Sequence, residues 1–236
     1  MEEKVMEKIN DLYVVYGSES ELLEDIFLFK NSYFVRIYNN RIPKDLKNAT
    51  DVNNLDDFKK IFTKKIAELK PLRIVFIGAG FLTQKDFFIK ETLEDIEKSI
   101  DVNIMQYIQL THFLLPFMIK IKSGNFIYLS SFRSQETCRG VSIYSASKAF
   151  GEKFFEVIGK ENAIFGIYST AIRMGYFDGR MITSMNPEKI TKIALSTGNR
   201  RLGNKDDLTK TIQFILNTNY VNGGVIELTG GINFQI

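Results

Sequence analysis

The chain has 236 residues, of which 44% are apolar and 25% are charged, so it can bury a sizeable core within one domain. These figures exclude collagen-like, disordered and disulfide-rich classes of protein. The single cysteine, Cys138, cannot form an internal disulfide, and the single histidine, His112, excludes a multi-histidine metal site. A net charge of +3 is too small to indicate binding to nucleic acid or to a membrane surface.

The sequence shows neither a targeting segment nor a membrane-spanning segment. Residues 1–8 are mostly charged and lack the apolar centre of a secretory signal. The longest apolar-rich stretch, residues 100–121, contains Asp101, Asn103 and His112, which predicts an amphipathic helix instead of a membrane span. We therefore expect a soluble cytoplasmic protein.

Short apolar runs alternate with longer helical patterns along the chain. The predicted strands cover residues 12–16, 33–38, 74–77, 125–129, 166–172 and 224–228. The predicted helices cover residues 20–29, 55–69, 93–120, 144–160 and 205–217. This alternation predicts a single α/β domain spanning residues 1–236, with a parallel sheet covered by helices on both faces. The least regular segment, residues 175–203, is a candidate substrate loop.

The segment Tyr144-Ser-Ala-Ser-Lys148 begins a predicted helix after the strand at 125–129. Side chains four residues apart share one helix face, so we expect the phenol and the ammonium about 4–5 Å apart. At that distance the ammonium lowers the pKa of the phenol by about 2–3 units, which allows proton exchange near neutral pH. A tyrosine and a lysine at this spacing also occur by chance, so the pair alone is a weak signal.

The context of this pair strengthens it. Ser131 follows the end of the strand at 125–129, and Asn103 lies within the long helical stretch. The segment Gly78-Ala79-Gly80 follows another strand, and ligand-binding groups in such sheets gather at the carboxyl ends of the strands. Together these residues resemble the short-chain dehydrogenase/reductase family over nearly the whole chain. Further matches are Asp51-Val52, Gly175 and the segment 228–231.

The resemblance implies a Rossmann-like doubly wound fold and an NAD(P)-dependent oxidoreductase that interconverts a carbonyl and a secondary alcohol. Tyr144 would exchange the substrate proton, Ser131 would bind the substrate oxygen, and Lys148 would lower the pKa of Tyr144 and hold the nicotinamide ribose. Asn103 would support a water chain to solvent. The residues that the resemblance places against the cofactor are Gly17, Arg41, Asp51, Val52, Gly78, Ala79, Gly80, Tyr144, Lys148 and Gly175.

The phosphate-binding turn departs from the family pattern. Where the family has three glycines after the first strand, this chain keeps Gly17 and has Glu21 and Leu23 at the other two positions. Ser18 and Glu21 have the spacing of a capping box, which would occupy the N–H groups that a pyrophosphate needs. Glu19 and Glu21 add negative charge, although acids at a helix start also stabilise the helix itself. Either the phosphates bind through altered contacts or tight cofactor binding is lost.

The choice between NADP and NAD depends on the residues that follow the second strand. No acid in residues 36–41 is available to bind a ribose 2′-hydroxyl, and Arg41 suits a 2′-phosphate, which tilts the expectation toward NADP. A solvated Arg41 is an equally simple interpretation. Asp51 resembles the family residue beside the adenine, but it is also a candidate cap of the following helix.

The substrate pocket is less clearly specified. Candidate lining residues are Phe132, Arg133, Arg139, Tyr176, Phe177, Arg180 and Met181. The arginines suit an anionic substrate, although solvation explains them equally well. His112 is expected to be buried or to lie at a subunit interface, and nothing marks Cys138 as reactive. Other departures from the family are Ile77-Gly78, Met174 and Gly179 at positions where asparagines, a proline and a threonine are usual.

Two functions therefore remain open. The first is an enzyme acting on a small-molecule carbonyl or alcohol with NADP or NAD, and the second is a non-catalytic binding or regulatory module with the same fold. The resemblance implies a homodimer or homotetramer in which the helices at 93–120 and 144–160 pair with their copies. Neither nucleic acid nor membrane is an expected partner.

Overall fold

The computed structural model describes residues 9–38, 46–80, 82, 87–136, 139–179, 182 and 185–232. Within these residues a seven-stranded parallel sheet has the order β3-β2-β1-β4-β5-β6-β7. Its strands are β1 (Asp11–Tyr16), β2 (Ser32–Ile37), β3 (Ala49–Val52), β4 (Arg73–Gly78), β5 (Gly124–Ser131), β6 (Ile167–Met174) and β7 (Gly224–Leu228). The expected doubly wound α/β fold is confirmed.

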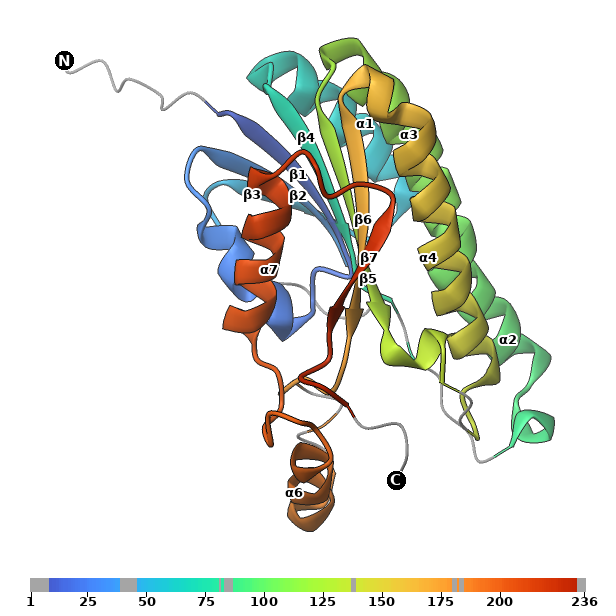
Figure 1. Cartoon of the computed structure of the whole chain (residues 1–236). Helices are drawn as coiled ribbons and strands as arrows, with labels where there is room; N and C mark the ends of the chain where they lie inside the picture. Colours follow the sequence, from blue (N-terminus) through green and yellow to red (C-terminus); the bar gives the residue numbers. More distant parts are fainter. Residues whose placement is uncertain are drawn as a thin grey trace.

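Helices cover both faces of the sheet, as Figure 1 shows. The α-helices are α1 (Leu55–Leu69), α2 (Leu93–Ile100), α3 (Gln106–Ile121), α4 (Ser142–Asn162), α6 (Pro187–Leu195) and α7 (Lys205–Asn217). The shorter turns are η1 (Glu21–Leu28), η2 (Phe88–Lys90), η3 (Asp101–Met105), η4 (Phe132–Ser134) and η5 (Ala163–Phe165). Helices α1, α3 and α4 pack on one face, whereas η1 and α7 pack on the other (Figure 1).

The central strands are largely apolar because helices cover both faces of the sheet. In β1, Leu12 and Val14 point into the core beneath α1, α3 and α4, while Tyr13 and Val15 point into the core beneath η1 and α7. The first of these cores is rich in aromatic rings, with Phe155 of α4 among them. The side chains of β1 alternate between the two faces, so each layer of helices buries its own half of the strand.

The six predicted strands and five predicted helical stretches all correspond to elements of this sheet and its layers. The short strand β3 (Ala49–Val52) was not predicted, because a run of four residues with two polar side chains has no strong apolar pattern. The segment 175–203 was expected to be irregular, but it contains α6, whose cap is Asn186. Residues 180, 181, 183 and 184 of that segment lie outside the described residues.

Two predicted helices differ in kind from the expectation. The first crossover, predicted as a helix over 20–29, is a 3-10 helix, η1 (Glu21–Leu28). The helix predicted over 93–120 is continuous but changes its winding at η3, a π-helical segment that lies between α2 and α3. Such π segments occur often at functional sites, since the extra residue redirects a side chain.

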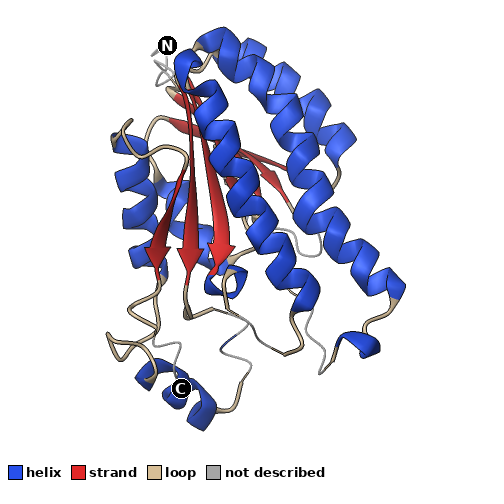
Figure 2. Cartoon of the chain, turned by 45° about the vertical axis from the view of Figure 1, so that its right-hand side comes forward, coloured by secondary structure: helices blue, strands red, loops and turns tan. Residues whose placement is uncertain are grey.

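The strands all end at the same edge, which we call the carboxyl edge; α6 lies beyond it (Figure 2). Strands β1 and β4 are neighbours at the centre of the sheet, yet the chain leaves β1 toward β2 and leaves β4 toward β5. The crevice above such a reversal of strand order is the usual ligand site of open α/β sheets. Every helix of the described residues is too short or too polar to cross a lipid bilayer.

Candidate active site

The ends of β1 and β4 meet at the centre of the carboxyl edge. Gly17 has φ +73°, and a Cβ at this position would lie 2.9 Å from the carbonyl oxygen of Ala79. The Ala79 amide donates to the Tyr16 carbonyl at 2.9 Å. Only glycine combines this left-handed conformation with so close an approach, so the sequence position of Gly17 is explained by the turn itself.

Asn103 reaches this crevice from η3 and is buried. The Tyr16 hydroxyl lies 3.0 Å from the Val102 carbonyl oxygen and 2.8 Å from Gln106 Oε1, both of which are acceptors. A π segment leaves backbone carbonyls without their usual helical partners, and the Tyr16 hydroxyl supplies a donor there. The end of β1 therefore holds the helix turn that carries Asn103.

Gly80 brings Asn103 and Lys148 together. A Cβ at Gly80 would lie 2.6 Å from Lys148 Nζ and 2.9 Å from Asn103 Oδ1. Lys148 is buried on α4, and its Nζ donates to the Leu129 carbonyl at 2.5 Å. The absence of a side chain at Gly80 therefore lets both polar groups lie directly against the end of β4, and we call this place the Gly80 cradle.

Tyr144 and Ser131 form the other half of the site. Ser131 ends β5, Tyr144 lies in the first turn of α4, and their side chains are hydrogen-bonded. Lys148 Nζ lies 5.6 Å from the centre of the Tyr144 ring and 4.9 Å from that of Tyr128. All four residues of the predicted Asn-Ser-Tyr-Lys set therefore lie together at the carboxyl edge.

The expected effect of Lys148 on Tyr144 is corrected by the structure. Burial raises the pKa of Tyr144, while the hydrogen bond from Ser131 and the charge of Arg133 lower it in part. Burial also lowers the pKa of Lys148 from 10.5 to about 7, although the nearby charge of Glu152 raises it. The lysine is thus too deeply buried to be the strong fixed cation that sequence spacing suggested.

Some of the residues predicted to line the substrate pocket contact one another after the end of β5. Arg133 pairs with Glu136 at 2.7 Å, donates to the Tyr176 hydroxyl at 3.1 Å and stacks over the ring of Phe132. The charge of Arg133 lowers the pKa of Tyr144, and Glu136 balances part of that charge. Arg139 lies over the Phe87 ring and Phe177 is buried, while Cys138, Arg180 and Met181 lie outside the described residues.

The predicted capping box in the phosphate turn is wrong. Ser18 Oγ donates to the Ile37 carbonyl at 3.2 Å, so this side chain joins the turn to β2 and does not cap η1. The residue before η1 is Ser20, whose side chain makes no capping hydrogen bond. Leu23 is fully buried in the same core as Leu208 of α7. The Ser20 side chain therefore does not cap the start of η1. Leu23, which stands where the family has a glycine, packs into the core.

A dinucleotide therefore fits this edge unevenly. Lys148 and Asn103 at the Gly80 cradle are the polar groups that would hold the ribose and nicotinamide end, as the family resemblance implies. At the phosphate end the fit rests on the close backbone approach of Gly17, because η1 has Glu21 and Glu24 in its first turn. Lys205 of α7 lies 3.9 Å from Glu24 and 3.0 Å from Asp25, which balances part of this negative charge.

Asp51 and Val52, which were predicted to contact the cofactor, have structural roles. Asp51 does not cap α1, since Asn54 does; its carboxylate instead pairs with Arg36 at 2.7 and 2.8 Å. Val52 is buried beside it at the end of β3. Arg41 lies outside the described residues.

His112 is exposed on α3, so the expectation of burial within the chain is wrong and an interface role stays a prediction.

Two further glycines on the edge are explained by close packing. A Cβ at Gly78 would lie 2.4 Å from a ring carbon of Tyr107, and one at Gly175 would lie 2.8 Å from Thr229 Cα. The Gly175 amide also donates to the Leu228 carbonyl at 2.9 Å. Both glycines shape the edge, whether or not they also contact a ligand.

Sequence reasoning missed a cluster of polar side chains beneath the site. Glu152, one helical turn beyond Lys148, accepts hydrogen bonds from Ser130 and Ser134, both at 2.7 Å. Arg173 of β6 donates to the same carboxylate at 3.0 and 2.8 Å. An acid four residues after Lys148 and an arginine near the end of a predicted strand were the available signals. We call Glu152, Arg173, Ser130 and Ser134 the Glu152 cluster.

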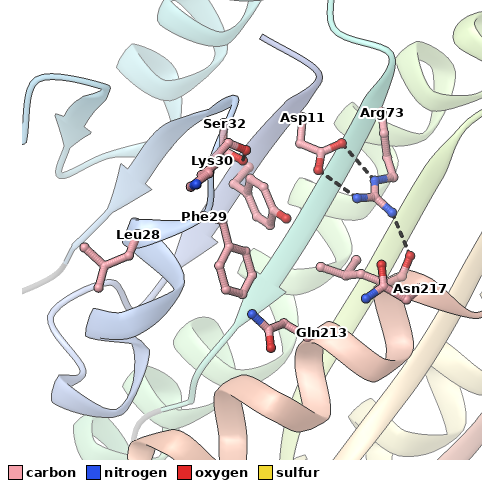
Figure 3. A pocket seen from close by; sticks show the side chains of 10 residues that line it. Asp11, Leu28, Phe29, Lys30, Ser32, Arg73, Gln213 and Asn217 are labelled. Atoms are coloured by element: carbon pink, nitrogen blue, oxygen red, sulfur yellow. Dashed lines mark hydrogen bonds and ion pairs between the residues drawn. The ribbon is translucent and has the colours of Figure 1, made fainter.

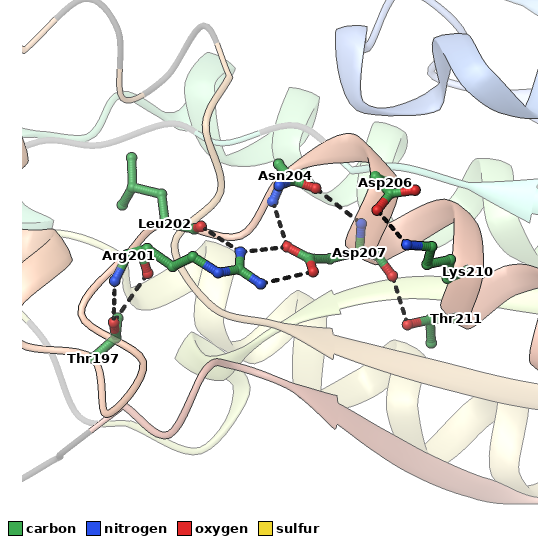
Figure 4. A network of polar contacts seen from close by, with 8 residues as sticks. All are labelled: Thr197, Arg201, Leu202, Asn204, Asp206, Asp207, Lys210 and Thr211. Atoms are coloured by element: carbon green, nitrogen blue, oxygen red, sulfur yellow. Dashed lines mark hydrogen bonds and ion pairs between the residues drawn. The ribbon is translucent and has the colours of Figure 1, made fainter.

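Two regions lie away from this centre. The connection from α6 to α7 is held by Arg201, which pairs with Asp207 at 2.6 and 2.9 Å, and by Asn204, which caps α7 (Figure 4). A cavity of about 350 Å³ lies at the amino ends of the strands, beside the Asp11–Arg73 ion pair (Figure 3). That cavity is on the opposite edge of the sheet from Tyr144.

The fold and the grouped Asn, Ser, Tyr and Lys side chains define a dehydrogenase of the doubly wound α/β class. A family model described as short chain dehydrogenase matches residues 39–190, and the chain belongs to this family of oxidoreductases. A 3-oxoacyl-[acyl-carrier-protein] reductase of Thermotoga maritima is 28% identical over 77% of this chain and 74% of its own length. An acetoacetyl-CoA reductase of a Synechocystis species is 26% identical over 78% of this chain and 76% of its own.

The fold is also that of solved structures. The structure of ElxO with NADP bound superposes with a TM-score of 0.81 over 94% of this chain and 97% of that chain, at 17% identity. The predicted family and fold are therefore both confirmed.

Proposed function

We propose that this chain interconverts a small-molecule carbonyl and the corresponding secondary alcohol with a nicotinamide dinucleotide. The observation that carries this proposal is the meeting of Ser131, Tyr144 and Lys148 at one point of the carboxyl edge, with Asn103 beside Lys148. Groups of these types supply the two requirements of the reaction, a pair of hydroxyls for the substrate oxygen and a route for its proton.

Ser131 and Tyr144 bind the substrate oxygen. Ser131 and Tyr144 lie within hydrogen-bonding reach of each other, and a substrate oxygen bound between them would replace that contact and accept a hydrogen bond from each hydroxyl. Tyr144 gives its proton to this oxygen during reduction and takes it back during oxidation. The cofactor supplies or accepts the hydride when bound.

Lys148 and Asn103 restore the proton on Tyr144. With a pKa of about 7, Lys148 holds and releases a proton near neutral pH, which suits a relay better than a fixed charge does. Asn103 Oδ1 lies beside Lys148 Nζ at the Gly80 cradle and leads the relay toward solvent. This role replaces the lowering of the Tyr144 pKa that was expected from sequence.

NADP is the favoured cofactor and NAD the alternative. Arg41 follows β2, the position from which a guanidinium meets a 2′-phosphate. Gly17, Ala79 and Gly80 would line the dinucleotide, together with Asp51 and Val52 at the adenine end and with Gly78 and Gly175 along the edge. The ElxO structure, which is named as NADP-bound, supports this preference.

Cofactor binding is tested by titrating the purified protein with NADPH and with NADH while its melting temperature is measured. Binding to the folded state raises the melting temperature by mass action. We expect a larger rise with NADPH. The alternative function, a binding module without catalysis, is favoured by Leu23 and the acidic residues of η1, and the absence of a shift with either nucleotide would favour it over the enzyme.

Catalysis is tested by Tyr144→Phe on a panel of small carbonyl compounds with NADPH. The substitution removes the hydroxyl and keeps the ring, so we expect the rate to fall by about 100-fold or more with nucleotide binding preserved. Tyr168→Phe, at a tyrosine of β6, is the matched control. A Tyr144→Phe enzyme as active as the parent would contradict the assignment.

We also propose that two or four copies assemble through α3 and α4, as the family resemblance implies. The outer surface of α4 includes Val157, which is 42% exposed, and the exposed His112 lies on α3. A buried interface on these helices would lie directly behind the catalytic turn of α4.

A further inference from the structure

The Glu152 cluster ties three strands to the catalytic helix. Ser130 of β5 is the register partner of Arg173 of β6, which is in turn the partner of Glu227 of β7. Arg173 donates to Glu152 with two nitrogens and to Glu227 Oε1 with the third, at 2.6 Å. The side chains of Arg173 and Glu152 are 8% and 11% exposed, whereas Glu227 is 56% exposed. The Arg173–Glu152 pair is therefore the buried end of this row.

The carboxylate of Glu152 holds both sides of the segment that carries Ser131. Its Oε1 accepts from Ser130, immediately before Ser131, and from Ser134, three residues after it. The same helix carries Tyr144 two turns earlier. One carboxylate thus fixes the strand end with Ser131 to the helix with Tyr144, and the distance between the two oxygen-binding hydroxyls depends on it.

The same carboxylate is the anion nearest in sequence to Lys148 on α4. The groups near Lys148 are Tyr128 of β5, Asn103 of η3, and Tyr144 and Glu152 of α4. Arg173 of β6 reaches this group through its ion pair with Glu152. Among these groups Glu152 is the carboxylate, and its charge favours the protonated form of Lys148 against the effect of burial.

We propose that Glu152, held by Arg173, is a positioning residue that fixes Ser131 against Tyr144 and supplies the anionic partner of Lys148. This inference rests on the proposed function for its catalytic meaning, but the electrostatic link to Lys148 is a property of the protein without cofactor or substrate. The two are therefore separable by experiment.

The electrostatic link is tested by NMR titration of the lysine side chains in the cofactor-free protein. The Lys148 resonance titrates near neutral pH and is identified by its loss in Lys148→Met. Glu152→Gln removes the charge and keeps the shape, so we expect the Lys148 titration to move down by about one pH unit. We expect the Lys148 titration to be unchanged in Glu156→Gln, the same change one turn further along α4. We expect it to be unchanged in Glu152→Asp as well, because the charge is kept. An unmoved titration in Glu152→Gln overturns the link.

The positioning role is tested by steady-state kinetics of the same variants. We expect Glu152→Gln to lower kcat by about tenfold or more, to change the KM of the nucleotide by less than about twofold, and to move the pH profile of kcat together with the Lys148 titration. Glu152→Asp recovers the pH profile but not the full rate, because the shorter side chain loses reach. A parent-like rate and profile in Glu152→Gln overturn the proposal.

A third variant keeps the test decisive if Glu152→Gln fails to fold. Ser134→Ala removes one hydroxyl that Glu152 accepts from and leaves every charge in place, so we expect a severalfold lower kcat with unchanged nucleotide KM and an unmoved Lys148 titration. An unchanged kcat overturns the positioning role. If the parent protein shows no oxidoreductase activity while Glu152→Gln still moves the Lys148 titration, the proposed function fails and the electrostatic inference stands.

Discussion

Lys148 is the residue on which the chemistry of the site depends most directly. Its ammonium group is buried and donates to a backbone carbonyl of β5, and burial lowers its pKa to about 7. A buried lysine is costly for the folded state, since the charged form loses its hydration there. The chain therefore carries a local destabilising group at the point where proton transfer is needed.

The cost of Lys148 predicts a pH-dependent gain in stability for Lys148→Met. Below about pH 7 the lysine is charged in both the folded and the unfolded chain, so the full cost of burial is present. As the pH rises from about 7 to 10.5 only the unfolded chain stays protonated, and the cost disappears. We expect Lys148→Met to raise the free energy of unfolding by about 2 kcal/mol at pH 6, and by much less near pH 10.

Urea unfolding at the two pH values measures this gain. Lys153→Met, at an exposed lysine on the same helix, is the control and should be neutral at both. A gain from Lys148→Met that does not depend on pH would contradict burial of the charged lysine as its cause.

Gly80 gives a second prediction at the scale of one residue. In Gly80→Ala the new methyl group would lie 2.6 Å from Lys148 Nζ, so the ammonium has to move out of the cradle. We expect nucleotide affinity, measured by calorimetry, to fall by about tenfold, with a loss of folding stability of about 1 kcal/mol. Equal nucleotide affinity in the variant and the parent would show that the cradle does not receive the cofactor.

At the scale of elements, the site depends on how closely α4 approaches β5. Gly151 faces Tyr128 on the strand, and a Cβ at this glycine would lie 2.2 Å from the ring. The absence of a side chain lets the helix that carries Tyr144 and Lys148 lie directly on the strand that ends at Ser131. The same close contact holds Phe155 against the Tyr128 ring.

Gly151→Ala should therefore destabilise the protein in spite of the better helix propensity of alanine. Overpacking costs about 1–3 kcal/mol, whereas the gain in propensity is about 1 kcal/mol, so we expect a net loss of up to about 2 kcal/mol together with lower activity. Gly224→Ala, at a strand glycine whose Cβ would meet nothing within 4 Å, is the control and should change the unfolding free energy little. Thermal and chemical unfolding measure both variants.

Elements also show where prediction from sequence stopped. The capping motif of Ser18 and Glu21 is local, but Ser18 bonds instead to the end of β2, a strand nineteen residues away. The π segment at Asn103 is held by the Tyr16 hydroxyl at the end of β1. Both outcomes depend on a neighbouring strand, so no local pattern indicates them.

At the scale of the whole molecule, one edge of the sheet carries the proposed chemistry and one helix layer is proposed to carry assembly. Parallel order places every strand end at the carboxyl edge, and the neighbouring β1 and β4 open the crevice there. Helices α3 and α4 cover one face, so an assembly on these helices would leave the crevice accessible to solvent.

The proposed assembly predicts that Val157→Glu reduces the size of the particle. A charge buried in an interface is costly, so we expect light scattering to show dimers or tetramers for the parent and smaller particles for the variant. Phe214→Glu, at a residue of α7 that is 56% exposed, is the control on the opposite layer. Equal particle sizes for all three proteins would exclude α4 as the interface.

The sequence by itself determined the parallel sheet and its two helix layers, because apolar periodicity and the order of the elements specify them. The family resemblance carried by Asn103, Ser131, Tyr144 and Lys148 predicted that these four residues lie together. Tertiary structure decided the raised pKa of Tyr144, the lowered pKa of Lys148 and the role of Glu152. These depend on burial and on partners from four different elements, and spacing along the chain measures neither.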